Sequence, residues 1–328
     1  MAVTMKDIAQ ASGVSTATVS KIINGNDKYI SENTRKTVNS IIKEMGYVPN
    51  ALAKGLKIKK TKMIGFILPD ISNPFFPEVA KGIEYAAQKR GFGVVMCNTN
   101  DSAESELECF QFLSSRMVDG IVFIRALRKG NLEKYFHSGI PIVLVDREIE
   151  ASTFGFGQIF IDTQKGVYES TKALIDAGCK KIAFISAEYT SSNDRYHGYC
   201  TALKKEEIDV DVSLVFRERY NVETGRKGIR HILKNSTVDG VVCGNDLIAV
   251  GVINTLSELG LKVPNDIKVI GFDDIYFSQH MNPPLSTVYQ PAYDMGTEAA
   301  NMLIDNILYG NPLYKKQLDY ELVIRGTV

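Results

Sequence analysis

The sequence predicts a small all-α helix-turn-helix head, followed by a larger α/β body that folds as two lobes. Two short helical patterns meet at Gly13, strand and helix patterns alternate from Met63 onward, and basic residues are concentrated near the start. The 328 residues are 45% hydrophobic and 23% charged, a composition typical of globular proteins that excludes a disordered or collagen-like chain. At roughly 100–200 residues per domain, this length indicates two domains, or two domains with a small third piece.

The net charge of zero hides a separation of charge along the chain. Residues 1–62 contain ten Lys and one Arg against four Asp and Glu, a net charge of +7, so the remaining 266 residues carry −7. A basic head on an acidic body is typical of a head that binds nucleic acid. A solvated, lysine-rich surface helix would give the same charge, so the charge alone does not decide between the two.

The head begins with two short helices. We expect the first over residues 4–12, with Thr4 as N-cap and Gly13 as C-cap, and the second over residues 16–23 after the N-cap Ser15. Two short helices that are joined by a turn of three or four residues containing glycine form a helix-turn-helix.

The second helix presents side chains that suit the major groove of DNA. Ser and Thr bond phosphates or base edges, Ala contacts a thymine methyl group, and Lys reaches guanine O6 or N7. A third helix, capped by Ser31 and ended by Gly46, is expected to close the core of the head. The outward positions of the second helix and its caps are Ser15, Thr16, Ala17, Thr18, Ser20, Lys21 and Asn24.

Residues 47–61 form a basic stretch that is too short to pack as a core helix. Gly55 would cost a helix about 1 kcal/mol relative to Ala, so we expect a linker that frays in solution. Such a segment becomes helical when phosphates neutralise its lysines, and a hydrophobic residue on it then wedges between base steps in the minor groove. Leu56 is the candidate wedge, and a plain flexible linker is the alternative.

From Met63 the chain alternates between strand and helix patterns, which is typical of parallel sheets with helices on both faces. About eleven strands are many for one sheet, so we expect two lobes, over about 62–161 and 162–289. A tail helix over 293–309 and a strand over 320–325 would cross back between the two lobes. The clearest strands are expected over residues 64–68, 93–97, 120–124, 140–145, 181–185, 240–243 and 267–272, and helices over 76–89, 105–117 and 247–259.

Polar side chains follow the ends of several of these strands. In open α/β lobes ligands bind outside the carboxyl ends of the strands, so a cleft between two lobes is the expected pocket. Carboxylates, amides and guanidinium groups beside paired aromatic rings suit a polyhydroxylated ligand. Each has a plainer explanation: Asp246 as the N-cap of the next helix, Phe75 and Phe76 as core, and Arg195 as a surface charge. The strand-end residues are Asp70, Asn73, Phe75, Phe76, Asp146, Arg147, Asn193, Asp194, Arg195, Tyr196, Asn245, Asp246, Asp273, Asp274 and Gln290.

Other site chemistry finds little support in the sequence. The five cysteines lack a C-x-x-C pair, and Cys97 and Cys243 lie in apolar strand patterns where buried, reduced thiols are expected. The four histidines lack ligand spacing, so we expect no metal and no cofactor. No P-loop, dinucleotide fingerprint or G-x-S-x-G motif is present, so an enzyme acting on a sugar or nucleotide is not expected. Without an apolar leader or membrane span, we expect a cytoplasmic, nucleoid-associated protein.

Three sequence segments resemble the lactose-repressor/galactose-repressor (LacI/GalR) family of bacterial transcriptional regulators. They are VTMKDIAQASGVSTATVSKIING at residues 3–25, ISENTR at 30–35 and GYVPNALA at 46–53. The resemblance extends over essentially the whole chain, and the body is also similar to periplasmic sugar-binding proteins. It implies a helix-turn-helix domain over 1–46, a hinge helix or linker over 47–61 and an effector-binding and dimerisation core over 62–328. The implied N-lobe covers about 62–161 and 293–322, and the C-lobe about 162–292 with the C-terminal strand.

The resemblance also implies roles for individual residues. Many family members carry Arg at the position of Lys21, and Lys lacks the bidentate fork of Arg, which affects base choice there. The implied contacts to bases and grooves are Thr16, Ala17, Lys21, Ala53 and Leu56, and those to the DNA backbone are Thr4, Ser15, Thr18, Ser20, Asn24, Ser31 and Thr34. The implied effector contacts are Asn73, Phe75, Phe76, Asp146, Arg147, Arg195, Tyr220, Asn245, Asp273 and Gln290.

The sequence thus predicts a sequence-specific DNA-binding transcriptional repressor whose operator affinity is controlled by a small effector, a pentose or hexose, bound between two lobes. A homodimer would place two heads on a near-palindromic operator. The alternative is a sugar sensor whose head docks on proteins rather than on DNA. The sequence identifies neither the sugar nor a phosphocarrier co-repressor, and the absence of a leucine heptad after Arg325 favours a dimer over a tetramer.

Overall fold

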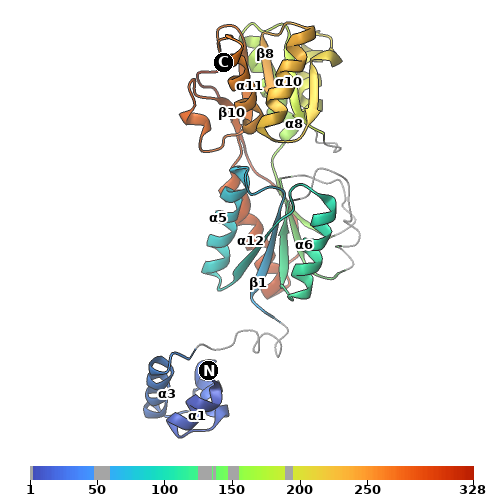
Figure 1. Ribbon diagram of the computed structural model, residues 1–328. Helices are drawn as coiled ribbons and strands as arrows, with labels where there is room; N and C mark the ends of the chain where they lie inside the picture. The colour runs from blue at the N-terminus through green and yellow to red at the C-terminus, as the bar shows by residue number, and fades with distance from the viewer. Residues whose placement is uncertain (1–2, 48–59, 125–134, 136–137, 147–154, 189–194) are drawn as a thin grey trace. The chain divides into compact units, whose positions relative to one another are not determined.

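The computed structural model describes residues 3–47, 60–124, 135, 138–146, 155–188 and 195–328 of the chain. The chain folds as two compact units, residues 1–61 and 62–328. Figure 1 shows the helices and strands of both units. Within the described residues, no helix combines the length and the apolar character that crossing a membrane requires.

The head is a three-helix unit whose helices each begin at a hydroxyl cap. Its helices are α1 (Met5–Ser12), α2 (Thr16–Ile23) and α3 (Glu32–Glu44). Gly13 ends α1 with φ +67°, a left-handed conformation that glycine adopts without steric cost. Ile8, Val19 and Val38, one from each helix, are fully buried against one another. This shared core fixes the angle between α1 and α2.

The first lobe of the body contains a six-stranded sheet in the order β11-β5-β4-β3-β1-β2, and all its strands are parallel. Helices α5 and α12 cover one face and pack so closely that a Cβ at Gly82 would lie 2.0 Å from the Tyr293 carbonyl oxygen. Helix α6 packs on the other face. The elements are β1 (Met63–Leu68), α5 (Phe75–Lys89), β2 (Gly93–Asn98), α6 (Ala103–Ser115), β3 (Gly120–Phe123), β4 (Ile142–Val145), β5 (Gly157–Phe160), α12 (Ala292–Tyr309) and β11 (Lys315–Gln317).

The second lobe repeats this plan with the order β12-β10-β9-β8-β6-β7, in which only the β10–β12 pair is antiparallel. Helices α8 and α9 cover one face, and α10 and α11 cover the other. The elements are α8 (Thr163–Asp176), β6 (Ile182–Ala187), α9 (Arg195–Lys205), β7 (Val215–Glu218), α10 (Val222–Asn235), β8 (Gly240–Cys243), α11 (Asp246–Glu258), β9 (Lys268–Asp273), β10 (Ser286–Tyr289) and β12 (Glu321–Val323).

The chain passes between the two sheets three times, after β5, after β10 and after β11. Each lobe is therefore built from segments that are distant in the sequence. In both sheets the parallel strands run with their carboxyl ends toward the same edge. Loops that leave these edges carry the polar residues that the sequence analysis selected.

The predicted fold class is confirmed: a small helical head precedes an α/β body with two sheets. The seven clearest strands all form, each end within two residues of its predicted position. The expectation for Cys97 is wrong, because this thiol is only half-buried, whereas Cys243 is fully buried. The reason is position in the sheet: β2 is an end strand, whereas β8 has a neighbour on each side.

Candidate functional site

Helix α2 presents its polar side chains to solvent. Thr16, Ala17 and Lys21 are exposed, while Val19 and Ile22 on the opposite face are buried in the core of the head. The N-cap Ser15 accepts a hydrogen bond of 3.1 Å from the backbone N–H of Thr18, which fixes the first turn. Three exposed side chains on one face of a rigid helix match what major-groove reading requires.

The predicted backbone contacts lie at helix ends. Thr4, Ser15 and Ser31 are the N-caps of α1, α2 and α3. The N-terminus of a helix carries partial positive charge and unpaired N–H groups, which attract phosphate. Asn24 lies at the other end of α2, where its Nδ2 donates to the Ser20 carbonyl oxygen at 2.7 Å. The remaining predicted backbone contacts lie in the same turns: Thr18 in the first turn of α2, Ser20 in its last turn and Thr34 in the first turn of α3.

Tyr29 in the turn between α2 and α3 is a candidate that the sequence analysis missed. Its side chain is 95% exposed, the highest value among the large hydrophobic side chains on the surface of the described residues. Lys28 precedes it, and Arg35 lies 3.7 Å from Asp27 across the same turn. An aromatic ring beside a lysine in a basic head is the signal that could have drawn attention to it. Ala53 and Leu56, the predicted minor-groove residues, lie outside the described residues.

The body contains a small, partly open cavity between its two lobes. Asn73, which follows β1, and Phe75 and Phe76 in the first turn of α5 line it from the first lobe, and Asp146 follows β4. From the second lobe come Arg195, Tyr220, Asn245 and Asp273. All eight belong to the predicted effector contacts, and the structure brings them together around one space. Arg147 lies outside the described residues, as do Asn193 and Asp194.

The first-lobe wall combines an amide with two aromatic rings. Asn73 is buried, and its Oδ1 accepts a hydrogen bond of 3.1 Å from the backbone N–H of Phe75, so its Nδ2 is the donor that remains for a ligand. The rings of Phe75 and Phe76 meet edge to face with centroids 5.4 Å apart. Both rings also belong to the hydrophobic core of this lobe. The core interpretation of this pair is therefore confirmed, and the same two residues also line the cavity.

Arg195 is the buried cation of the cavity, so the surface-charge alternative is wrong. Its Nη1 donates to the Tyr220 hydroxyl at 2.8 Å, its Nη2 lies 3.9 Å from Asp273 Oδ1, and its guanidinium stacks 4.3 Å from the centroid of the Phe272 ring. Burial lowers the pKa of Arg195, but Tyr220, Asp146 and Asp273 outweigh this, so the pKa lies above its ordinary value. The group stays charged. Within the described residues its buried Nε has no hydrogen-bond partner.

Asp273 lines the cavity from the second lobe, whereas Gln290, also a predicted effector contact, is not among the lining residues and contacts Asp273 instead. Gln290 Nε2 donates to Asp273 Oδ1 at 2.7 Å, and in the described part of the chain the buried Gln290 Oε1 has no partner. Burial raises the pKa of the Asp273 carboxyl well above its ordinary value, although the neighbouring guanidinium of Arg195 opposes this. Buried polar atoms are rarely left unpaired, so Arg195 Nε in the cavity lining marks a position where a ligand or water belongs.

Asn245 and Asp246, which follow β8, have different roles. Asn245 is the N-cap of α11 and accepts a hydrogen bond of 3.0 Å from the Ile248 N–H, so the N-cap interpretation belongs to Asn245 and is wrong for Asp246. The Asp246 carboxylate is fully buried and accepts hydrogen bonds from Ser278, Thr287 and the backbone of Ile275. It anchors neighbouring chain segments behind the cavity wall.

The cavity offers a defined set of partners to a small molecule. It presents two carboxylates, one guanidinium, amide groups and two aromatic edges, and most of these side chains are already buried without a ligand. Carboxylates and amides bond vicinal hydroxyl groups, while aromatic rings pack on apolar faces. Among the described lining residues Arg195 is the only cation, and it already contacts Tyr220 and faces Asp273, so the cavity offers no further cation to a phosphorylated ligand.

Two parts of the chain match known protein families. Residues 4–50 match the family described as "Bacterial regulatory proteins, lacI family", and residues 171–328 match a periplasmic binding protein-like domain. The chain is 40% identical to the HTH-type transcriptional regulator RegA of Clostridium saccharobutylicum, over 97% of this chain and 95% of RegA. It is 32% identical to the ribose operon repressor of Halalkalibacterium halodurans, over 99% of this chain and 96% of that repressor.

Among solved structures, a LacI family transcriptional regulator from Enterococcus faecium with bound ribose matches with a TM-score of 0.72 and 27% identity. The match covers 81% of this chain and 98% of that one. These relatives are transcriptional regulators, and two of the three are named for ribose or hold it. With matches that extend from the helix-turn-helix head through the two-lobed body, the chain belongs to the lacI family of bacterial regulatory proteins.

Proposed function

We propose that this protein is a transcriptional repressor whose affinity for a near-palindromic operator is controlled by a free pentose or hexose bound in the cavity between the lobes. The observation that carries the proposal is the convergence of Arg195, Asp273 and Asn245 with paired aromatic rings around one cavity between the lobes. The ribose in the E. faecium regulator supports the same ligand class.

A panel of sugars tests the effector class. A ligand at 100 times its dissociation constant stabilises the folded state by about 2.7 kcal/mol, which raises the melting temperature of the body measurably. We expect D-ribose or another free pentose or hexose to give this shift, and the corresponding sugar phosphates to give none. A shift with phosphorylated compounds alone would contradict the free-sugar assignment. Operator binding with and without the active sugar then measures the coupling, for which about 5- to 150-fold is typical.

We propose that α2 and the linker contribute differently to DNA binding: α2 reads the bases, and the linker adds affinity through the minor groove. Thr16→Ala removes a base-facing hydroxyl, so the order of preference among operator variants should change. Leu56→Ala removes the proposed minor-groove wedge, so affinity should fall for all operators with little change in preference. Lys36→Ala is the control, because this lysine on α3 is paired with Glu32 at 2.9 Å on the surface. Electrophoretic mobility shifts at fixed salt measure the affinity of the three variants for each operator. If Thr16→Ala and Leu56→Ala change affinity and operator preference in the same way, the two separate roles are refuted.

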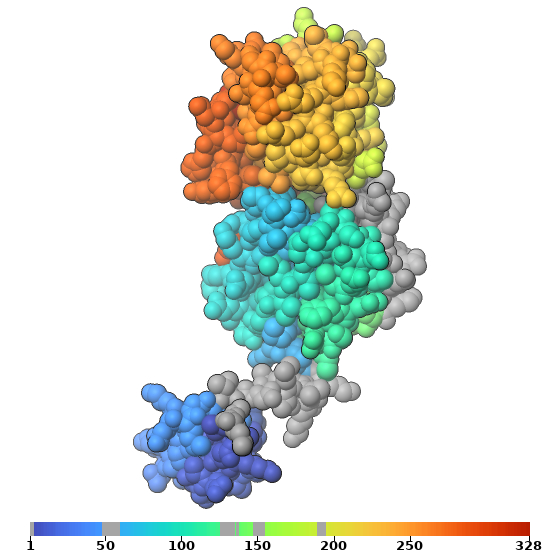
Figure 2. All heavy atoms as spheres, in the orientation of Figure 1, coloured from blue at the N-terminus to red at the C-terminus, as the bar shows by residue number. Residues whose placement is uncertain are grey.

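We propose a homodimer as the DNA-binding species. Support comes from apolar side chains that a monomer leaves in water: Met96 on the end strand β2 is 49% exposed, and Phe112 on the following helix α6 is 46% exposed. Helix α6, coloured green-blue, lies on the surface of the body in Figure 2. A second copy would cover these side chains. Sedimentation equilibrium should give twice the mass of the chain at micromolar concentration, and a single-chain mass would exclude the dimer.

A further inference from the structure

The turn that follows β9 adopts a backbone conformation that needs support. Asp273 has φ +108° and Asp274 has φ +52°, so two consecutive residues with side chains lie in the left-handed region. Each such residue costs of order 1–3 kcal/mol and persists only where the surrounding structure holds it in place. Asp273 lines the effector cavity, so the support of this turn determines where its carboxylate lies.

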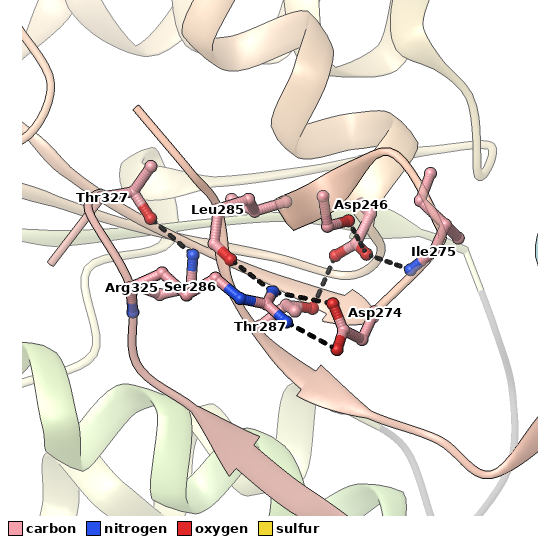
Figure 3. A network of polar contacts seen from close by, with 9 residues as sticks. Asp246, Asp274, Ile275, Leu285, Ser286, Thr287, Arg325 and Thr327 are labelled. Atoms are coloured by element: carbon pink, nitrogen blue, oxygen red, sulfur yellow. Dashed lines mark hydrogen bonds and ion pairs between the residues drawn. The ribbon is translucent and has the colours of Figure 1, made fainter. Parts of the chain in front are cut away.

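Arg325, three residues from the C-terminal end of the sequence, supports the turn from one side (Figure 3). Its Nη1 donates to Asp274 Oδ1 at 2.7 Å, and its Nη2 donates to Asp274 Oδ2 at 2.9 Å, a bidentate pair. Nη1 also donates to the Leu285 carbonyl oxygen at 2.8 Å, and the backbone N–H of Arg325 donates to Ser286 Oγ at 2.8 Å. The arginine thereby ties the turn to the start of β10.

Asp246 supports the turn from the other side. Its Oδ2 accepts from the Ile275 N–H at 2.9 Å and from Ser278 Oγ at 2.6 Å, and its Oδ1 accepts from Thr287 Oγ1 at 2.6 Å. A Cβ at Gly271 would lie 2.1 Å from this Oδ1, so glycine leaves the room that the carboxylate occupies. Asp274 and Ile275 are thus held between an arginine fork and a buried carboxylate, as Figure 3 shows.

We propose that Arg325 is a positioning residue of the effector site: its bidentate pair with Asp274 holds the strained turn that directs the Asp273 carboxylate into the cavity. The C-terminal segment of the chain thereby sets effector affinity although Arg325 is absent from the residues that line the cavity. The planar fork explains why an arginine is used here, because a lysine ammonium cannot bond both carboxylate oxygens in one fixed geometry. This inference rests on the proposed effector site.

The first test compares two arginines in the full-length protein by calorimetric titration with D-ribose. Arg325→Met should weaken D-ribose binding by about 10-fold or more. Arg90→Met is the matched control, because Arg90 makes a half-buried pair with Asp305 at 2.7 Å in the other lobe, away from the cavity. It should leave the affinity unchanged. Equal losses in both variants, or no loss in Arg325→Met, would overturn the proposal.

A second test isolates the backbone strain. In the Arg325→Met background, Asp274→Gly and Asp274→Ala both remove the unpaired carboxylate, but only glycine accepts φ +52° without steric cost. If the arginine acts by holding the turn, the glycine variant should bind D-ribose about 5- to 30-fold more tightly than the alanine variant. If Arg325 stabilises the fold without holding this turn, the glycine and alanine variants should bind D-ribose with equal affinity. Equal affinities would therefore reject the mechanism.

Hydrogen exchange in the ligand-free protein separates this inference from the proposed effector. The peptide covering residues 272–278 should exchange faster in Arg325→Met than in wild type and in Arg90→Met. If wild type binds no D-ribose but exchange is faster, ribose is rejected as the effector and the support of the turn by Arg325 stands. Unchanged exchange in Arg325→Met overturns the inference whatever the sugar result.

Discussion

Replacing Arg195 by Met is expected to weaken effector binding by about 100-fold or more. Truncating one member of a buried charge pair costs about 2–5 kcal/mol, because its partners are left buried and unpaired. Here the partners are the Tyr220 hydroxyl at 2.8 Å and the Asp273 carboxylate at 3.9 Å. The stem of Met keeps much of the packing on the Phe272 ring, so the change acts mainly on the charge. Titration calorimetry with the active sugar from the panel measures the loss.

The matched control for this prediction is Arg217→Met. Arg217 is exposed on β7 of the same lobe and stacks 4.8 Å from the centroid of the Tyr196 ring. The Arg217→Met variant therefore loses an arginine–aromatic contact but no residue that lines the cavity. It should bind the sugar like wild type. Operator binding of the Arg195 variant should persist but no longer respond to the sugar. If Arg195→Met keeps wild-type affinity, the cavity between the lobes is not the effector site.

Replacing Asp246 by Asn is expected to change how stability depends on pH. Burial raises the pKa of the Asp246 carboxyl from 3.8 to about 7, although the hydrogen bonds from Ser278, Thr287 and Ile275 oppose the shift. Between about pH 4 and pH 7 the folded protein therefore holds a proton that the unfolded chain has released. The free energy of unfolding falls as pH rises through this window, with a slope of up to about 1.4 kcal/mol per pH unit.

Asn mimics the protonated carboxyl and does not titrate, so the Asp246→Asn variant should lose this slope. From pH 5 to pH 7 the wild-type body should lose about 2 kcal/mol more stability than the variant, measured by urea denaturation at each pH. Asp176→Asn, which changes an exposed carboxylate at the end of α8, is the control and should keep the wild-type slope. A parallel pH dependence in wild type and Asp246→Asn would show that this carboxyl is ionised throughout the range.

The sequence predicted local structure well where one periodic pattern dominated. Helix α2 begins and ends at the predicted residues, because Ser15 is a strong cap and Asn24-Gly25 cannot continue the helix. The end of α5 at Lys89 was likewise predicted. Short strands at sheet edges, such as β11, gave no usable pattern, since half-exposed edge strands lack a continuous apolar run.

The candidate site was predictable as a set but not in its internal order. Strand-end positions converge by topology, so seven of the selected strand-end side chains meet at one cavity, together with Tyr220, which only the family resemblance implied. The difference between Asn245 as a helix cap and Asp246 as a buried anchor was not predictable, because adjacent polar residues after a strand look alike until the partners are known. Those partners, Ser278 and Thr287, lie 32 and 41 residues away along the chain.

The sequence by itself determined the helix-turn-helix head, the α/β character of the body and the residue types that surround the cavity, since these follow from local periodicity, capping and strand ends. Only the tertiary structure decided which groups are buried, which of them pair, and that Arg325 supports a turn at Asp274, 51 residues earlier. The physical reason is that desolvation and hydrogen-bond geometry depend on distances in space, and the three passages of the chain between the two sheets set these distances independently of local sequence.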